Sequence, residues 1–593
     1  MNPTLRVLPH VPQDRRLFPN RHTDTHFDPP RFASREEADA RREELVFNLR
    51  MAAGLYPYPE KTPLNPRREL VGHFEGYSLY KIMFESYPGL WSTGNLYLPS
   101  PSDGPHPAIL NVIGHWSEQR LTRMDTADYP QQLANFARMG FVCLVTDMIG
   151  MVDSRQLSHN YGREERELWC SNGLGVQLWN NIRALDLLCS LPEVDATRIG
   201  VTGASGGGSQ TLFLSLLDER IKAAAPINMI SLHMQGGCQC ENAAGLRRHT
   251  TNTEMCAMLA PRPLFLAGST EDWTKYQETE EFPAIRDVYA LYGAESMVDH
   301  YYQIAPHQYN EKTRKRVYRF FARHLMGREL MWEEEPIETP YLPNMVWFKE
   351  GERAPGFACD ADYFAAHKRE LLSRIAPLPM SEKKRMLAWV TGIGPRPFIC
   401  ADGDVEEADG YTLERNVLIS TDGEQIPWIK LTPKGWDGKR LCLVLGEDKT
   451  CVLDPAAKAM LESGVALLSG DLFLTGEYGE ARPIIQGPDA ATRYFTTFHY
   501  TSAAQKARDV ALLGQLAASM TETLSLYAAG SAARAAVCAL PLLPAVAHAT
   551  LDGEAMAITS DEAYMRDFFL PGLLPLGGLA GCLALAECPV TVI

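Results

Sequence analysis

The sequence predicts an α/β fold with a mostly parallel, doubly wound sheet that occurs twice along the chain. Three observations lead to this prediction. From Ala108 onward, short apolar runs alternate with amphipathic runs, as in a parallel sheet covered by helices on both faces. A strand-like run, 199–202, enters Gly-Ala-Ser-Gly-Gly at 203–207 and is followed by a helix-compatible run, 211–217. After about residue 411 the same alternation returns.

Length, composition and charge describe a soluble protein with more than one core. The chain has 593 residues, of which 45% are apolar and 22% charged, so two large domains are expected. The formal net charge of −16 argues against nucleic acid or an anionic membrane as a partner.

The cysteines predict a reduced protein without a metal site. Thirteen cysteines are scattered along the chain, which is not the pattern of a disulfide framework. Cys238 and Cys240 form a lone C-x-C with no second pair at zinc-like spacing. We therefore expect no structural zinc and no cofactor.

The N-terminal 27 residues contain no apolar run typical of a signal peptide. We expect a cytoplasmic protein, or a secreted or periplasmic one if a leader was removed before this numbering.

The first 330 residues divide into an arm and a first α/β domain. The arm, 1–70, contains one helix that starts at the capping box Ser34-Arg-Glu-Glu. The domain, 71–330, opens with an edge hairpin at 77–85 and 90–98. Its expected buried strands are 108–113, 141–146, 199–202, 221–226, 263–268 and 298–304, and its expected helices are 129–139, 179–191, 211–217 and 311–326.

The remainder predicts a connector and a second, truncated copy of the domain. The connector, 331–410, contains expected helices at 361–375 and 381–390. The second copy, 411–593, repeats the hairpin and the buried strands, and its run 524–530 leads into 531–534 and then a helix, as in the first copy. Aligning Gly530 with Gly203 puts Ala532 opposite Ser205. After the last expected strand, no loops equivalent to those that carry Asp272 and His307 can follow. This copy is therefore expected to be degenerate and to do no covalent chemistry.

The turn at 203–207 has the pattern that exposes a nucleophile. Ser205 lies between glycines in a strand–turn–helix, where a tight turn lifts the hydroxyl clear of the sheet. Side chains at 203 and 207 would collide with the neighbouring strand and helix. A phosphate loop is excluded because no Lys-Ser/Thr pair follows the glycines.

Partners for Ser205 follow later strands. Asp272 comes after the strand 263–268, and His307 follows the strand ending at 304. Serine, acid and histidine in this order, each just past a strand, predict a catalytic triad. The backbone N–H of Gly206, with that of His115 or Trp116, is expected to form the oxyanion hole.

Several motifs resemble the bacterial acetylxylan-esterase-like branch of the α/β-hydrolases, over roughly residues 35–330. They are GASGGGSQT at 203–211, DWT at 272–274, PHQYN at 306–310, VDSRQ at 152–156 and MQGGCQCEN at 234–242. The resemblance implies an α/β-hydrolase fold, the triad Ser205, Asp272 and His307, and an oxyanion hole at Gly206 and His115. Ile113 stands where relatives usually carry His, which makes the geometry of the oxyanion loop less secure, and Gln308 stands where many have Asn.

The expected activity is that of a serine carboxylester hydrolase. The resemblance implies a small acyl group, acetyl, on a sugar or xylo-oligosaccharide. Candidate pocket residues are Trp116, Trp169, Trp273 and Gln235, although each tryptophan also fits an ordinary core position.

Three alternatives stay open. A glucuronoyl-type ester hydrolase would need an arginine at the pocket that the sequence does not locate. A prolyl-oligopeptidase-like peptidase shares the triad order, but no β-propeller repeat precedes the domain. The third is a non-catalytic binding or scaffold protein. The acyl group, the alcohol and any homo-oligomer are not fixed by the sequence.

Overall fold

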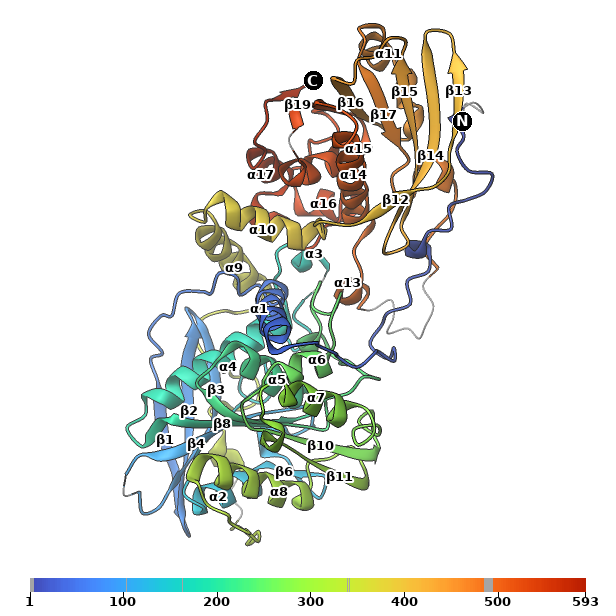
Figure 1. Ribbon diagram of the computed structural model, residues 1–593. Coiled ribbons are helices and arrows are strands. Elements are labelled where there is room, and N and C mark those ends of the chain that lie inside the picture. The colour runs from blue at the N-terminus through green and yellow to red at the C-terminus, as the bar shows by residue number, and fades with distance from the viewer. Residues whose placement is uncertain are drawn as a thin grey trace. The chain divides into compact units, whose positions relative to one another are not determined.

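The computed structural model describes residues 5–102, 104–162, 164–338, 340, 342–484, 494–544 and 546–593. The chain forms two compact units. The larger unit comprises residues 22–166 and 171–370, and the smaller unit comprises residues 1–21, 167–170 and 371–593. Each unit is built around one sheet (Figure 1).

The larger unit contains a nine-stranded sheet with the order β1-β2-β3-β7-β4-β8-β9-β10-β11. The first four strands in this order pair antiparallel, and β7, β4, β8, β9, β10 and β11 pair parallel. The strands are β1 (Arg67–Phe74), β2 (Tyr77–Tyr87), β3 (Leu90–Pro99), β4 (His106–Val112), β7 (Val142–Thr146), β8 (Val194–Ala204), β9 (Ile221–Ile227), β10 (Leu264–Glu271) and β11 (Val298–Pro306). The predicted α/β fold is confirmed.

Helices cover both faces of this sheet (Figure 1). They are α1 (Arg35–Ala52), α2 (Tyr129–Arg138), α4 (Gly173–Ser190), α5 (Gly206–Leu217), α6 (Asn252–Ala257), α7 (Glu281–Ala290) and α8 (Glu311–Phe321). On one face, α2 and α8 share an aromatic core in which the ring of Phe136 meets those of Tyr318 and Phe321 edge-on. On the other, α4 and α5 pack against β8. Burying these aromatic rings stabilises the packing of α2 and α8.

Local sequence signals explain where most helices and strands begin. Where the structure differs from the prediction, the difference has a physical cause. Ser34 caps α1 by accepting the Glu37 N–H, as its capping box predicts. Strand β1 was not expected, because its residues are mostly exposed and charged and lack apolar alternation. The helix expected at 311–326 is α8 followed by a π-helical turn, Ala322–Met326.

The strand order of the smaller unit matches that of the larger one from β1 to β10, with no counterpart of β11 among the described residues. Its sheet runs β12-β14-β15-β17-β16-β18-β19-β20, with β13 paired to β14. The antiparallel part, β12 to β17, precedes a parallel part, β17 to β20. The strands are β12 (Phe398–Cys400), β13 (Asp404–Ala408), β14 (Tyr411–Ser420), β15 (Gln425–Pro433), β16 (Arg440–Leu445), β17 (Ala466–Gly470), β18 (Thr523–Ala528), β19 (Val546–Leu551) and β20 (Val590–Val592). Two sheets of one order make a tandem arrangement.

The helices of the smaller unit include a second turn of elbow type. They are α10 (Met380–Thr391), α11 (Pro455–Glu462), α13 (Phe495–Phe498), α14 (Ser502–Ala518), α15 (Ser531–Ala539), α16 (Asp561–Asp567) and α17 (Gly578–Ala584), while α9 (Asp360–Ile375) spans the division between the units. Between β18 and α15, Gly530 has φ 57° and ψ −145°. Ser205 has nearly the same conformation, φ 59° and ψ −127°. The predicted alignment was therefore wrong by two residues, because Gly530, not Ala532, occupies the nucleophile position.

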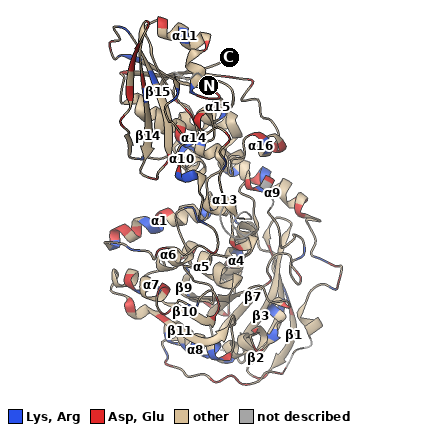
Figure 2. Ribbon diagram, turned by 90° about the vertical axis from the view of Figure 1, so that its right-hand side faces the viewer, with Lys and Arg blue, Asp and Glu red and all other residues tan. Residues whose placement is uncertain are grey.

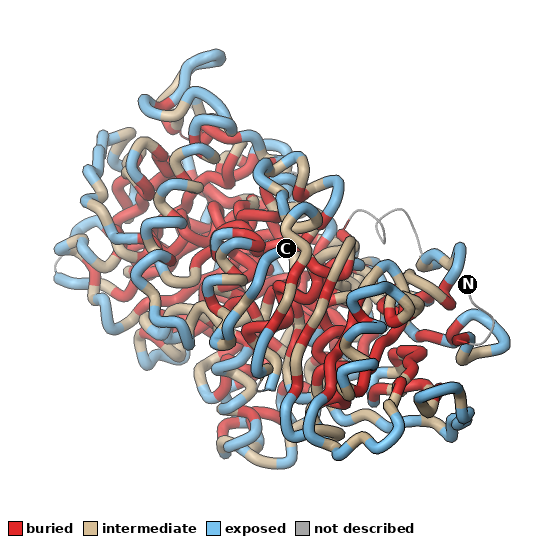
Figure 3. The backbone as a smooth tube through the Cα atoms, turned by 90° about the horizontal axis from the view of Figure 1, so that it is seen from above, coloured by how far each residue is buried: buried red, intermediate tan, exposed pale blue. Residues whose placement is uncertain are grey.

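Burial and charge follow the expected division between core and surface. Buried residues gather in the interior and exposed ones at the periphery of the backbone (Figure 3). Acidic and basic side chains are interspersed on the outer helices, as on α1 (Figure 2). In the described part of the chain, no helix is long and apolar enough to cross a membrane.

Candidate active site

Ser205 lies at the carboxyl end of β8, immediately before α5. Its φ of 59° is unusual for a residue with a side chain, and such strain is typically stored at functional sites. Its hydroxyl does not cap the helix. The helix begins at Gly206 rather than at the predicted Thr211. The Ser205 Oγ therefore stands at the helix N-terminus without a structural role there.

The glycines around Ser205 are required by close backbone contacts. A Cβ on Gly203 or on Gly207 would lie 2.2 or 2.3 Å from the Val112 carbonyl oxygen. No side chain fits at such distances. The predicted collision with the neighbouring strand is confirmed for both positions.

His307 and Asp272 form a pair at the same edge of the sheet. Asp272 directly follows β10 and His307 directly follows β11. The His307 Nδ1 lies 3.3 Å from Asp272 Oδ2, without the alignment of a hydrogen bond. The Asp272 side chain is fully buried. Catalytic contacts of this kind are often loose in a protein without substrate.

The Asp272 carboxylate is held by three hydrogen bonds. The backbone N–H of Trp273 donates to Oδ1 at 2.7 Å, and Thr274 Oγ1 and Asn228 Nδ2 donate to Oδ2 at 2.8 and 2.7 Å. Charge-assisted bonds of this type fix a buried carboxylate in position. Asn228 and Thr274 were missed from the sequence. The available signal was that Asn228 directly follows β9 and that Thr274 lies in the acid loop.

The imidazole of His307 lies between two indoles. The Trp116 ring is stacked with it at 5.8 Å between centroids, and the Trp273 ring is tilted at 4.4 Å. Neither ring nitrogen of His307 has a hydrogen-bond partner among the described residues. No other described group therefore competes for the proton of Nε2.

His115 lies against the start of α5. A Cβ on Gly206 would be 2.5 Å from His115 Cε1, so the two predicted oxyanion residues are in direct contact. Burial opposes protonation of His115, but a hydrogen bond to the Cys238 sulfur and the charge of Glu241 raise its pKa overall. The pKa of Cys238 is lowered to about 2, above all by a hydrogen bond from Cys240.

One segment of the larger unit matches a known protein family. Residues 65–231 match the acetyl xylan esterase (AXE1) family model. This part of the chain is a carboxylesterase-type hydrolase. The matched segment contains His115, Ser205 and Gly206, whereas Asp272 and His307 lie beyond it.

The relatives and solved structures similar to this chain are identical to it at about a quarter of the aligned residues or fewer. A Bacillus subtilis (strain 168) protein named "Putative hydrolase YtaP" is 25% identical over 218 residues, which cover 34% of this chain and 72% of the relative. Among solved structures, Methylesterase BT1017 is 26% identical with a TM-score of 0.46, covering 58% of this chain and 78% of that one. A glucuronoyl esterase from Solibacter usitatus is 15% identical with a TM-score of 0.40, covering 51% and 98%. The fold of this hydrolase is assigned from its own strand order and elbow.

Two of the candidate pocket residues of the hydrolase have other surroundings. Gln235 is fully buried; its amide donates to the Ser231 carbonyl at 2.8 Å, and its Oε1 accepts the Asn252 N–H at 2.7 Å. Trp169 belongs to the smaller unit, where its Nε1 donates to Asp561 Oδ2 at 2.8 Å. Gln235 therefore stabilises a loop through backbone hydrogen bonds. Trp169 belongs to the smaller unit, whereas Ser205, Asp272 and His307 belong to the larger one.

A buried arginine organises the motif at 152–156. Arg120 is fully buried and binds Asp147 at 2.7 Å and Asp153 at 2.8 Å. Burial raises the pKa of Asp147 to about 6, although the Arg120 charge opposes this shift. A satisfied network of this kind rigidifies its loop. This part of the resembling sequence is thus structural.

Proposed function

We propose that this chain is a serine carboxylester hydrolase that removes acetyl groups from an acetylated carbohydrate. Ser205 is the nucleophile, His307 the general base and acid, and Asp272 the residue that orients the imidazole. The backbone N–H groups of Gly206 and His115 bind the oxyanion.

One observation carries this proposal. A serine with a strained backbone, φ 59°, stands at the carboxyl ends of parallel strands, the edge that also holds the His307–Asp272 pair with its 3.3 Å contact. A strained backbone at the serine, a hydroxyl that does not cap its helix and an imidazole beside a buried carboxylate are the features that activate a serine for acyl transfer.

The reaction proceeds through an acyl-enzyme. Ser205 Oγ attacks the ester carbonyl while His307 Nε2 takes its proton, and the new Oγ–C bond leaves a tetrahedral oxyanion. His307 then protonates the departing sugar hydroxyl as the C–O bond breaks. Water adds to the acyl carbon by the same route, and acetate leaves as Ser205 regains its proton.

Aromatic and charged residues favour a neutral sugar ester. The indoles of Trp116 and Trp273 flank His307 and offer flat apolar faces to a sugar ring. Arg120 binds two protein carboxylates. Arg247 is buried against Asn242, Asn252 and the Glu241 carbonyl. Neither arginine is available to a uronate carboxylate, which weighs against the glucuronoyl alternative.

The test is a hydrolysis panel of aryl acetate, butyrate and octanoate esters, acetylated xylo-oligosaccharides and a methyl glucuronate ester. For acetate over butyrate we expect a ratio in kcat/KM of roughly 10-fold or more, because each methylene that does not fit changes the barrier by about 1–3 kcal/mol. A flat profile through octanoate would contradict the deacetylase proposal and favour a lipase-like pocket. If the glucuronate ester alone were hydrolysed, the substrate would be a uronate ester and the deacetylase proposal would be wrong.

A further inference from the structure

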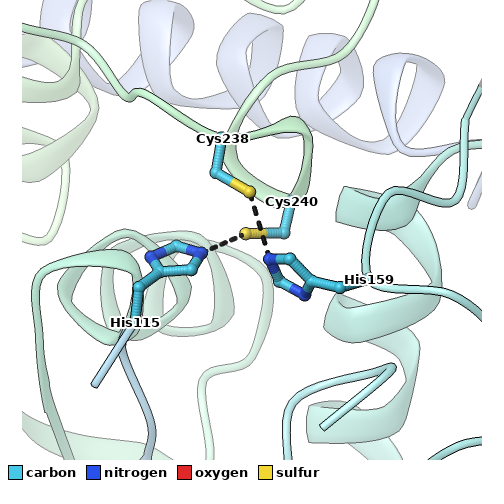
Figure 4. Close-up of side chains that lie close together, drawn as sticks. All are labelled: His115, His159, Cys238 and Cys240. Carbon is cyan, nitrogen blue, oxygen red and sulfur yellow. Dashed lines mark hydrogen bonds between the residues drawn. The ribbon is translucent and has the colours of Figure 1, made fainter. Parts of the chain in front are cut away.

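Four side chains with metal-binding atoms converge beside the elbow. They are His115, His159, Cys238 and Cys240, and their ligand atoms all lie within 4.8 Å of one another. Figure 4 shows the two imidazoles and the two thiols pointing toward a common centre. The residues come from three segments that are far apart in the sequence, so the juxtaposition is a property of the fold.

The distances suit a tetrahedral ion. His115 Nε2 lies 3.2 Å from Cys240 Sγ, and His159 Nε2 lies 3.2 Å from Cys238 Sγ. In a tetrahedron with zinc–nitrogen bonds of about 2.0–2.1 Å and zinc–sulfur bonds of about 2.3 Å, a nitrogen–sulfur edge measures about 3.5 Å. These two nitrogen–sulfur edges therefore differ by only a few tenths of an ångström from those of a zinc tetrahedron.

We propose that His115, His159, Cys238 and Cys240 bind a structural zinc ion. Two thiolates and two imidazoles form a donor set that zinc prefers. Four protein ligands close the coordination sphere, which is typical of structural rather than catalytic zinc. The inference departs from the expectation of no metal, which rested on the lack of a second cysteine pair and could not foresee two distant histidines as partners.

The surroundings orient the ligands as a metal site requires. The other ring nitrogen of His159, Nδ1, lies 3.0 Å from the Ile149 carbonyl oxygen. That contact selects the tautomer with a free Nε2 lone pair on the side of the thiols. Glu241 Oε2 accepts the Cys238 N–H at 3.2 Å, which fixes the segment that carries both sulfur ligands.

The ligand loop is also tied to the elbow helix. Ser209 Oγ donates to Glu241 Oε1 at 2.7 Å, and Gln210 Nε2 donates to the Cys240 carbonyl at 3.0 Å. His115 itself lies against Gly206. A zinc ion here would hold the loop that presents the His115 backbone next to the start of α5. The side chain of His115, as a zinc ligand, would then position the backbone N–H that the same residue contributes to the proposed oxyanion hole.

A second cluster provides a matched control. His26, His233 and Glu280 also lie within reach of one ion. Their imidazoles are stacked at 4.0 Å between centroids, and both approach the same oxygen, Glu280 Oε2. Hydrogen bonds to the carboxylate already explain this group, and it contains no sulfur ligand.

The test is the zinc content of the full chain, purified without an affinity tag and measured by inductively coupled plasma mass spectrometry. We expect about one zinc per chain, and a loss to below about one tenth in Cys238→Ser, Cys240→Ser and His159→Ala. Cys359→Ser, at an exposed cysteine, and His26→Ala should retain zinc. Wild-type protein that stays free of zinc after incubation with the ion, or loss of zinc in His26→Ala alone, would overturn the proposal.

Cobalt substitution keeps the test decisive if a variant fails to fold. Cobalt(II) at this site should give the intense visible bands of tetrahedral geometry together with thiolate-to-cobalt charge transfer. His26→Ala should leave this spectrum unchanged, and Cys238→Ser, at a half-buried position, should remove charge-transfer intensity. A bound cobalt without thiolate bands would contradict the assigned ligands. These readouts do not depend on esterase activity, so the two proposals fail separately.

Discussion

At the scale of single residues, the site depends on clearances around the elbow. Ser205 keeps a left-handed conformation because the neighbouring glycines let the backbone of β4 approach closely. Gly206 has the additional task of accommodating the imidazole of His115 against its Cα, at a distance where a methyl group would be 2.5 Å from the ring. The proposed oxyanion hole therefore depends on the absence of a side chain at Gly206.

Gly206→Ala should reduce kcat without unfolding the protein. The new methyl group pushes the His115 ring away from α5 and displaces its loop, so one oxyanion donor is misplaced. Loss of one such donor costs about 10²–10³ in kcat. Gly394→Ala is the matched control, because a Cβ there meets nothing within 4 Å. Steady-state kinetics and circular dichroism check the prediction, and unchanged kcat in Gly206→Ala would refute the role of this contact.

At the scale of elements, helix α7 begins with a buried acid. Glu281 Oε1 accepts the Leu232 N–H at 2.7 Å, whereas Oε2 has no partner among the described residues. Burial raises the pKa of Glu281 to about 7. In the unfolded chain a glutamate titrates near 4.3. Between these values the folded protein binds more protons, so stability falls as pH rises and is lowest above pH 7.

Glu281→Gln should remove this pH dependence. At pH 5 the variant and wild type should have similar stability, and at pH 8 the variant should be more stable by up to about 3 kcal/mol, the free energy of the pKa shift. Glu280→Gln is the control. Burial raises its pKa, but hydrogen bonds from His26 and His233 lower it overall, so its removal should not stabilise the fold at pH 8. Melting curves at both pH values decide, and a Glu281→Gln difference that does not grow with pH would contradict the expectation.

Elements were predictable where one local signal dominated. The capping box at Ser34 and the buried strands of the parallel sheet follow directly from sequence pattern. Strand β1 pairs through its backbone and carries exposed charges. Its side chains therefore show no alternation of apolar and polar residues from which a strand could be predicted. The start of α5 was placed too late because its three glycines are poor helix formers, and they are tolerated because the close contacts leave no room for side chains.

At the scale of the whole molecule, one strand order occurs twice with different chemistry. The second elbow keeps the backbone conformation of the first but carries Gly530 at the nucleophile position. The adjacent hydroxyl, on Ser531, donates to Glu447 Oε2 at 2.8 Å. We therefore propose that the smaller unit is a degenerate copy that performs no acyl transfer.

Part of the candidate active site could be predicted from the sequence. The positions of Ser205, Asp272 and His307 follow from order and strand ends, which chain topology fixes. The partners of Asp272 and the cluster of His159 with Cys238 and Cys240 depend on loops whose paths have no periodic signal. Side chains brought together by such loops could be found only in three dimensions.

The most direct test of the central claim is labelling of the full chain with a fluorophosphonate, followed by peptide mass spectrometry. We expect one modified residue, Ser205, with esterase activity lost in proportion to labelling. Ser205→Ala should abolish both labelling and turnover beyond a residual rate of roughly 10³–10⁴ over water, whereas Ser531→Ala should match wild type. Labelling of another serine, or more than a few per cent of wild-type activity in Ser205→Ala, would contradict the assignment of Ser205 as the nucleophile.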